Sequence, residues 1–298
     1  MAFEAPQRLV RALGESDVWL GQLPKTVQEA ADRWELDVER VMAPGGRSSL
    51  VLLVRQPDGT AATLKVAPPS ASPPLEQAAL AHWDGFGAVR LLGAADGALL
   101  LERLHPEVSL RSLPEAKALL EAAGAVRRLW VEPPAGHDFE TVAERTARQA
   151  EAMRGSAEPG SGSGSGSTAG LVSAALAARD ELTALSPELL LLHGNFRQGK
   201  VLAADRTPWL AVGPEPLVGE RAYDLARLVR DRVEDLIASA AGASAARRRV
   251  NRLADSLEVD ADRLRGWTLF RAVESGTRAI AAGRRQEGEL ALEFAGWL

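Results

Sequence analysis

Lys65 stands at the end of an apolar run that has the composition of a β-strand. From that position its ammonium group can reach phosphate oxygens, and Glu76, in the helix expected next, is a natural partner to hold it. Ahead of the strand, Gly45, Gly46 and Ser48 form a loop whose backbone N–H groups suit the approach of a phosphate. These residue types in this order predict a phosphate-binding site.

Each of these signals also has an ordinary structural explanation. Any tight turn favours glycine, and a lone lysine at a strand end is usually a surface residue. The lysine is more informative here because it is one of only four in a chain that otherwise uses arginine.

The elements around these residues predict a small lobe that contains a β-sheet. Apolar side chains at three- and four-residue intervals predict helices in the first forty residues, with a break between Gly21 and Pro24. Strands are expected at residues 48–54, 61–66, 88–92 and 98–103, and a helix that carries Glu76 follows a proline-rich link. The first domain, a nucleotide-binding lobe, is predicted to comprise residues 1–104.

The second domain, residues 105–298, is predicted to be a mainly helical lobe. Its helices are expected at residues 116–129, 141–153, 171–185, 222–238, 244–257 and 261–282. Short apolar runs between residues 189 and 212 predict a small β insertion. The Gly/Ser run at residues 159–168 cannot bury apolar surface, so we expect a flexible exposed loop, natural or designed. The predicted fold class is α+β with two lobes.

The composition excludes several kinds of function. A formal net charge of −5 gives no electrostatic reason for nucleic acid or an anionic membrane as partner. Without cysteine there are no disulfides, thiolate metal sites or cysteine nucleophiles, and four dispersed histidines make a histidine metal centre unexpected. The sequence has no signal-peptide pattern and no run of ~20 apolar residues, so we expect a cytoplasmic protein. A protein partner is left open.

The most specific pattern lies between Leu191 and Ala226. It reads LLHGNFRQGKVL from residue 191 and WLAVGPEPLVGERAYDLA from residue 209. This resembles the catalytic core of the aminoglycoside/hydroxyurea antibiotic resistance kinase family, the branch that includes streptomycin 6-kinase. Its members read His-Gly-Asp-Leu-His-x-Gly-Asn-Val-Leu, then Asp-Pro-Lys-Pro and Val-Gly-Asp-x-Ala-Tyr-Asp-Leu-Ala. The likeness covers nearly the whole chain and implies a protein-kinase-like fold that transfers phosphate from ATP to a hydroxyl group.

Three positions depart from the family pattern. Asn195 stands where the resemblance implies the catalytic aspartate, and an amide cannot take a proton near neutral pH. Lys200 and Gly213 stand where the resemblance implies the two ligands of Mg²⁺, and neither side chain can bind a metal cation. Arg197 replaces the second histidine of the family motif. We therefore expect binding of Mg²⁺ to be lost or weak.

Two other residues of the pattern are expected to be structural. The resemblance implies that Asp224 holds the catalytic loop through backbone hydrogen bonds, and His193 is expected to be buried nearby. The seven tryptophans are interpreted as lobe packing.

The favoured hypothesis is a pseudokinase that binds a nucleotide or an aminoglycoside-like small molecule but has lost most phosphoryl transfer. A repurposed site is also considered, in which Lys200 and Arg197 supply the positive charge that Mg²⁺ normally gives. ATP would then bind without metal through Lys65, Lys200 and the glycine loop. The alternative is an active ATP-dependent O-phosphotransferase of the streptomycin 6-kinase type, in which Asp205, Glu215 or Glu220 replaces the base. Glu215 is also a candidate partner for Lys200. A third hypothesis, prompted by the Gly/Ser run, is a deliberately inactivated chain.

Overall fold

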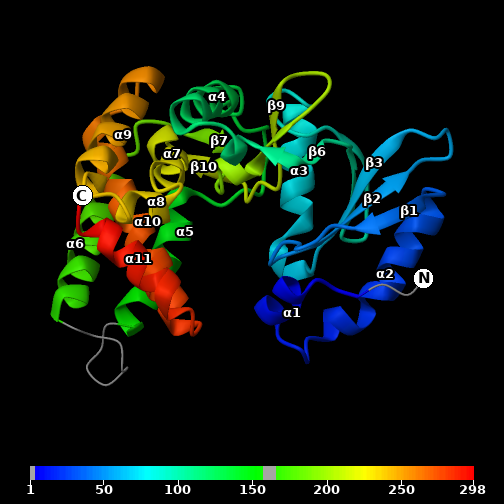
Figure 1. The fold of residues 1–298 in the computed structure, drawn as a ribbon, viewed down its shortest axis with the longest axis horizontal. Helices are drawn as coiled ribbons and strands as arrows, with labels where there is room; N and C mark the ends of the chain where they lie inside the picture. The colour runs from blue at the N-terminus through cyan, green and yellow to red at the C-terminus, as the bar shows by residue number, and fades with distance from the viewer. Residues whose placement is uncertain (1–3, 157–165) are drawn as a thin grey trace. The chain divides into compact units, whose positions relative to one another are not determined.

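The computed structural model describes residues 4–156 and 166–298 (Figure 1). Contacts within the chain divide it into two compact units. The N-terminal unit comprises Met1–Ser109 and Leu202–Gly213, and the C-terminal unit comprises Leu110–Val201 and Pro214–Leu298. The domain boundary at residue 104 stays a prediction, although the short β segment after residue 201 groups with the N-terminal unit and not with the helices.

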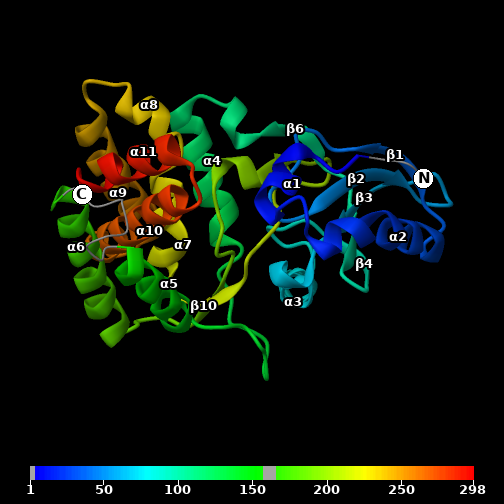
Figure 2. The ribbon, with the colours of Figure 1, turned by 90° about the horizontal axis from the view of Figure 1, so that it is seen from below.

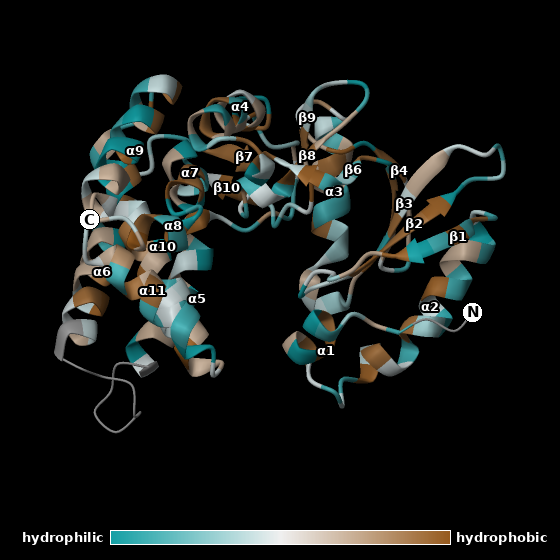
Figure 3. Ribbon diagram, in the orientation of Figure 1, coloured by the Kyte–Doolittle hydropathy of each residue, from teal (hydrophilic) through white to brown (hydrophobic). Residues whose placement is uncertain are grey.

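A five-stranded antiparallel sheet with the order β1-β2-β3-β5-β4 forms the centre of the N-terminal unit. Its strands are β1 (Asp37–Val41), β2 (Leu50–Arg55), β3 (Ala61–Val66), β4 (Leu91–Ala95) and β5 (Ala98–Glu102), and the helices of this unit are α1 (Gln7–Leu13), α2 (Val18–Arg33) and α3 (Pro73–Trp83). Alternate residues of β2 and β3, such as Leu52 and Leu64, are fully buried in one core with Leu23 and Val27 of α2. This period-two burial defines the face of the sheet that α2 covers, and the strands are correspondingly hydrophobic (Figures 2 and 3).

The helix break predicted between Gly21 and Pro24 is wrong, because α2 runs through Pro24. A proline lacks only one helical hydrogen bond donor, and the apolar face of α2 stays buried on both sides of it. The start of α2 is capped by Asp17, which accepts from the backbone N–H of Trp19 at 2.9 Å.

Two strands of this sheet differ from the prediction. β1 was missed because its sequence, DVERV, is mostly charged, and none of its residues is fully buried at the sheet edge. β4 covers Leu91–Ala95 and not residues 88–92, because Ala88 forms a separate bridge to Ala211. That bridge joins a second sheet of the N-terminal unit, which consists of β6 (His105–Ser109), β8 (Val201–Ala203) and β9 (Trp209–Ala211).

Helices make up most of the C-terminal unit. They are α4 (Glu115–Arg127), α5 (Val142–Ser156), α6 (Gly166–Ala184), α7 (Arg221–Val229), α8 (Val233–Ile237), α9 (Gly242–Leu257), α10 (Ala261–Ala281) and α11 (Arg285–Ala295). The long helix α10 contacts α5, α6, α7, α9 and α11, and its Trp267 and Phe270 are fully buried. The strands β7 (Leu190–Leu192) and β10 (Leu217–Gly219) pair antiparallel, with Leu192 opposite Leu217. This pairing brings the loop after β7 beside the loop before β10.

Three predictions for this unit need correction. The single helix expected at residues 222–238 is two helices, because the chain turns at Arg232, whose φ is +56°. The helix α11 was not predicted. Part of the loop predicted at residues 159–168 belongs to α6, which begins at Gly166, while residues 159–165 lie outside the described part of the chain. Among the described residues, no helix is long and apolar enough to cross a membrane.

Candidate functional site

Lys65 and Glu76 lie together in the N-terminal unit, as their order in the sequence predicts. Lys65 is on β3, opposite Val51 of β2 and Leu99 of β5, and its ammonium group contacts the Glu76 carboxylate of α3. Both side chains are largely buried, with 13% of Lys65 and 5% of Glu76 exposed. The second carboxylate oxygen of Glu76 is buried and has no hydrogen bond partner among the described residues. The pairing is therefore confirmed, while binding of phosphate by Lys65 stays a prediction.

The predicted glycine loop has a backbone that requires glycine at Gly45. Its φ is +73°, and a Cβ atom there would lie 2.6 Å from Cβ of Pro6. Gly46 and Ser48 are exposed at the same loop. The backbone conformation and the close approach of Pro6 explain why glycine is required at position 45. A phosphate-binding role for the loop stays a prediction.

The turn after β7, which carries Asn195, is held by a buried carboxylate. Asp224 of α7 accepts hydrogen bonds from the backbone N–H groups of His193 at 3.0 Å and Gly194 at 2.9 Å. The indole N–H of Trp130 donates to the same carboxylate at 3.3 Å. Burial raises the pKa of Asp224, although these donors and the nearby Arg271 act to lower it. The predicted structural role of Asp224 is confirmed.

His193 is buried as expected. Its Nδ1 atom accepts from the backbone N–H of Asn195 at 3.2 Å, so its proton is assigned to Nε2. Its ring also contacts Phe196 edge-on, with ring centres 5.6 Å apart. Both contacts fix the conformation of the turn that presents Asn195.

Glu215 lies against Asn195 because two chain segments approach closely here. Gly194 has φ +73°, and a Cβ atom at this position would lie 2.0 Å from the carbonyl oxygen of Glu215. The backbone N–H of Glu215 donates to the carbonyl of His193 at 2.9 Å. On the side-chain level, Nδ2 of Asn195 donates to Oε1 of Glu215 at 2.6 Å. A carboxylate therefore lies beside the position where the family motif has its catalytic aspartate.

The Asn195 side chain is itself only half satisfied. It is buried, with 6% of the residue exposed, and its Oδ1 atom has no hydrogen bond partner among the described residues. An unpaired buried acceptor is unfavourable, so a donor group of a ligand would be stabilising there. The pairing suggested between Glu215 and Lys200 stays a prediction, because the amide contact concerns only the Oε1 atom of Glu215.

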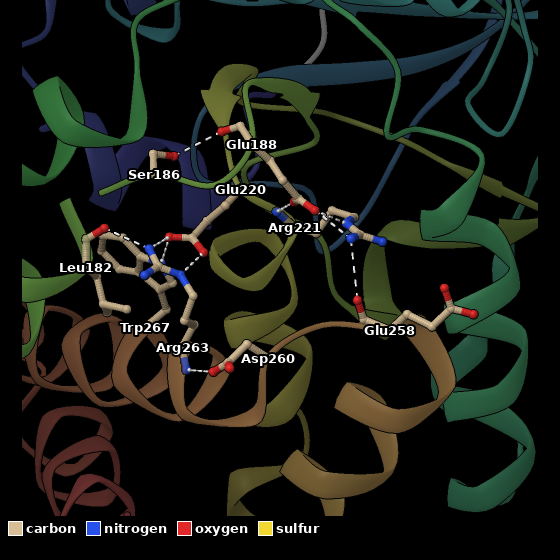
Figure 4. Close-up of polar contacts among 9 residues, drawn as sticks. All are labelled: Leu182, Ser186, Glu188, Glu220, Arg221, Glu258, Asp260, Arg263 and Trp267. Atoms are coloured by element: carbon tan, nitrogen blue, oxygen red, sulfur yellow. Dashed lines mark hydrogen bonds and ion pairs between the residues drawn. The ribbon is translucent and has the colours of Figure 1, made fainter. Parts of the chain in front are cut away.

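The two other acids considered as substitute bases have different surroundings. Glu220 is buried and accepts from Arg263 and from the indole N–H of Trp267, each at 2.6 Å (Figure 4). Its role is structural, because both carboxylate oxygens are occupied. Asp205 belongs to the N-terminal unit, where its side chain is 88% exposed and contacts Nε2 of His105 at 2.8 Å. Of the three acids, Glu215 is the one that contacts Asn195.

The residues at the two positions that the resemblance assigns to Mg²⁺ do not fit this ion. Gly213 has no side chain to offer, and Lys200 carries a positive charge. No group of three or more histidines, cysteines, aspartates or glutamates in residues 4–156 and 166–298 is arranged to hold a metal ion.

Three arginines near this turn belong to no motif that the sequence pattern singles out. Arg271 of α10 donates to the carbonyl oxygens of Gly194 at 2.8 Å and Tyr223 at 3.0 Å. Arg227 and Arg230 lie at the end of α7, three residues apart. That helical spacing was visible in the sequence, but only the packing of α7 on α10 brings the three guanidinium groups near one another.

The fold defines the class of protein, which is that of the kinase-like folds. The crystal structure of aminoglycoside phosphotransferase APH(4)-Ia matches with a TM-score of 0.64 at 14% identity, covering 92% of this chain and 97% of that one. The family model of the aminoglycoside/hydroxyurea antibiotic resistance kinases matches residues 33–283, and the chain belongs to this family.

Two relatives illustrate the range of names within the family. Streptomycin 6-kinase of Streptomyces glaucescens is 34% identical over 281 residues, covering 92% of this chain and 88% of the relative. Hydroxyurea phosphotransferase of Kitasatospora aureofaciens is 33% identical over 287 residues, covering 91% of this chain and 75% of the relative.

Proposed function

We propose that this chain is an ATP-dependent O-phosphotransferase that modifies a hydroxyl group of an aminoglycoside-like small molecule, with Glu215 as the base. The observation that carries this proposal is the 2.6 Å contact between the Asn195 amide and the Glu215 carboxylate. The relatives named streptomycin 6-kinase and hydroxyurea phosphotransferase support the reaction class. Glu215 thereby changes from one of three candidates to the favoured one.

The division of roles follows from the chemistry of the two side chains. Glu215 is exposed, and a carboxylate can take the proton of an attacking hydroxyl, which the amide of Asn195 cannot do. Asn195 holds this carboxylate through Nδ2 and offers its unpaired Oδ1 to a donor group of the acceptor. Lys65, held by Glu76, would hold phosphate oxygens of ATP.

An open acidic depression on the surface of the C-terminal unit supports a cationic acceptor. It has a volume of about 650 Å³ and is lined by His137, Asp138, Phe139, Glu140, Glu144, Ala147 and Arg148. Glu140 is neutralised there by Arg145 and Arg148. Asp138 and Glu144 leave negative charge on the wall, which suits the ammonium groups of an aminoglycoside.

The second candidate function is a pseudokinase that binds its ligands without phosphoryl transfer. It is favoured by Lys200 and Gly213 at the two metal-ligand positions, because the metal supplies much of the charge neutralisation in phosphoryl transfer. On this hypothesis ATP binds without metal.

The experiment incubates the protein with ATP and a panel that includes streptomycin and hydroxyurea, with Mg²⁺ or with EDTA. ADP release and product mass are followed. We expect slow turnover that Glu215→Gln lowers by about 10²–10⁴-fold, the usual contribution of a general base, and that Lys65→Ala also lowers.

Two controls make this result specific. Glu234→Gln, which neutralises an exposed carboxylate of α8, should leave turnover unchanged. An absence of turnover with every acceptor, together with thermal stabilisation by ATP in EDTA, would overturn the proposal in favour of the pseudokinase.

A further inference from the structure

Helices α7 and α10 pack together with arginines on the faces that meet. Arg227 and Arg230 are three residues apart on and after α7, while Arg271 and Ser275 are four residues apart on α10. The guanidinium group of Arg230 donates to Oγ of Ser275 at 3.1 Å and to the carbonyl of Arg271 at 3.5 Å. These contacts place the side chains of both helices in one cluster.

The cluster extends to the turn that carries Asn195. Arg271 donates to the carbonyl of Gly194 at 2.8 Å, and its guanidinium carbon lies 4.4 Å from the centre of the Tyr223 ring. Arg197 follows Asn195 by two residues and acts electrostatically on Arg227. We call Arg197, Arg227, Arg230 and Arg271 the arginine cluster.

The positive charge of the arginine cluster is not balanced by ion pairs. Within residues 4–156 and 166–298, none of its four members has a carboxylate at ion-pair distance, whereas the neighbouring Arg278 is paired with Glu274 at 2.7 Å. Arg227 and Arg197 form no hydrogen bond within the same ranges, and Nε of Arg197 is buried. Two guanidinium groups are therefore left with their donors available to a ligand.

Burial makes this arrangement unfavourable without a counter-charge. Burial, followed by repulsion from Arg271, Arg230 and Arg197, lowers the pKa of Arg227 to about 9. Burial and Arg271 lower the pKa of Arg230 to about 10. Both values lie above neutral pH, so both side chains stay charged. Glu215 acts against the repulsion at Arg227, and Glu274 and Asp231 act against it at Arg230, but the net effect at both arginines is a lowered pKa. A bound anion would remove this destabilisation.

We propose that the arginine cluster is a binding site for a phosphate-type oxyanion beside the Gly194–Asn195 turn. The guanidinium groups of Arg197 and Arg227, which form no hydrogen bond within the described ranges, can each donate two parallel hydrogen bonds to an anion with three or four oxygens. Arg230 and Arg271 donate to Ser275 and to backbone carbonyls, so they contribute mainly positive charge. The site goes beyond the proposed function, because it would bind phosphate equally in a chain without transfer activity. A nucleotide and a phosphorylated small molecule share this chemistry, and the experiment distinguishes the two sources.

The experiment measures binding to the full chain by calorimetry in EDTA, with inorganic phosphate and pyrophosphate as probes. We expect both to bind, pyrophosphate more tightly, with affinity that falls as salt is added. Arg227→Gln and Arg197→Gln should each weaken binding roughly ten-fold or more, as expected for a lost charged hydrogen bond. The matched control is Arg252→Gln on the exposed face of α9, which should bind like the original chain.

A second readout separates ligand binding from a structural role. Because Arg227 is repelled by its neighbours, Arg227→Gln should raise the melting temperature of the ligand-free protein, by about 2 °C for each kcal/mol relieved. The proposal is overturned if neither anion binds, or if both arginine variants bind like Arg252→Gln. A lowered melting temperature for ligand-free Arg227→Gln would equally count against it.

The source of the phosphate is decided by two further arms, ATP in EDTA and glucose 6-phosphate. Loss of ATP affinity in the arginine variants assigns the cluster to the nucleotide, and loss of sugar phosphate affinity assigns it to the second ligand. Phosphate binding without turnover would support this site and overturn the proposed function. If both variants leave turnover unchanged and neither inorganic anion binds, the proposed function is supported and the anion site is overturned.

Discussion

A few single residues fix the conformation of the turn at Asn195, mostly through contacts with its backbone. Asp224 accepts from two successive N–H groups, and Gly194 leaves room for the carbonyl of Glu215. An amide has a donor group that a carboxylate lacks, which is why Asn195 can hold the neighbouring carboxylate of Glu215. The amide at position 195 and the carboxylate at position 215 are therefore chemically complementary, one as donor and the other as acceptor.

Gly194→Ala tests this close approach. A Cβ atom would lie 2.0 Å from the Glu215 carbonyl oxygen, and φ is +73°. We expect a loss of about 2–5 kcal/mol in the free energy of unfolding from backbone strain and overpacking, measured by urea denaturation. Gly124→Ala is the matched control, since nothing lies within 4 Å of its Cβ position in α4. That variant should be stabilised by about 0.5–1 kcal/mol, and equal effects of the two would contradict the structure.

At the scale of elements, short polar contacts decide where helices begin and how loops join them. Glu188 accepts from the backbone N–H of Arg221 at 3.0 Å, the first residue of α7, and from its guanidinium group at 2.7 Å (Figure 4). A carboxylate at a helix N-terminus is favoured both by the free N–H groups and by the helix dipole. Glu188 thus fixes the start of the helix that carries Asp224.

Glu188→Gln tests this contact through its pH dependence. Burial alone would raise the pKa of Glu188, but the hydrogen bonds from Arg221 lower it below 4.5. Since the folded state favours the charged form, this stabilisation is complete above the ordinary value and is lost as pH falls through the lower folded value. We expect Glu188→Gln to lose about 1–2 kcal/mol at pH 7 and less at pH 3.

Thermal unfolding of both proteins between pH 3 and pH 8 measures this difference. Glu234→Gln serves as the control, because its carboxylate is exposed. A difference between Glu188→Gln and the original chain that does not shrink on acidification would contradict the assignment.

At the scale of the whole molecule, the family residues are distributed over both compact units. Lys65, Glu76 and Gly213 belong to the N-terminal unit, and Asn195 and Lys200 to the C-terminal unit. The positions that the resemblance assigns to the metal are thus in separate parts of the chain, Gly213 in one unit and Lys200 in the other. Because Glu215 contacts Asn195, a change at position 195 also has to take the Glu215 carboxylate into account.

Restoration of Mg²⁺-dependent nucleotide binding is the corresponding prediction. The family residues at the three altered positions correspond to Asn195→Asp, Lys200→Asn and Gly213→Asp. With Glu215 retained, Asn195→Asp would place two carboxylates at hydrogen bond distance, and one of them would bind a proton. We therefore expect restoration only when Glu215→Lys, the family residue, is added. Aspartate tolerates the φ of +61° at position 213.

Calorimetry with ATP, in Mg²⁺ and in EDTA, measures this restoration. The variant with all four substitutions should bind ATP at least about ten-fold more tightly in Mg²⁺ than in EDTA, as expected for two regained metal ligands. Equal affinity with and without Mg²⁺ would show that positions 200 and 213 are not the metal-ligand positions.

The sequence by itself determined the pairing of Lys65 with Glu76, because a strand followed by a helix is a local pattern. The kinase-like fold and the structural role of Asp224 followed from ordered motifs that resemble the family. The altered positions at Asn195, Lys200 and Gly213 are implied by the same resemblance and stay predictions. The sequence could not predict β1, whose charged residues lie at a sheet edge, or the turn at Arg232, whose left-handed backbone has no glycine to mark it.

Only the tertiary structure shows which acid contacts Asn195. The pairing of β7 with β10 brings the loop after β7 beside the loop before β10, and so places Glu215, not Glu220, against Asn195. Only the packing of α7 on α10 brings Arg227, Arg230 and Arg271 together. Contacts between residues tens of positions apart depend on packing, and periodicity in the sequence does not contain that information.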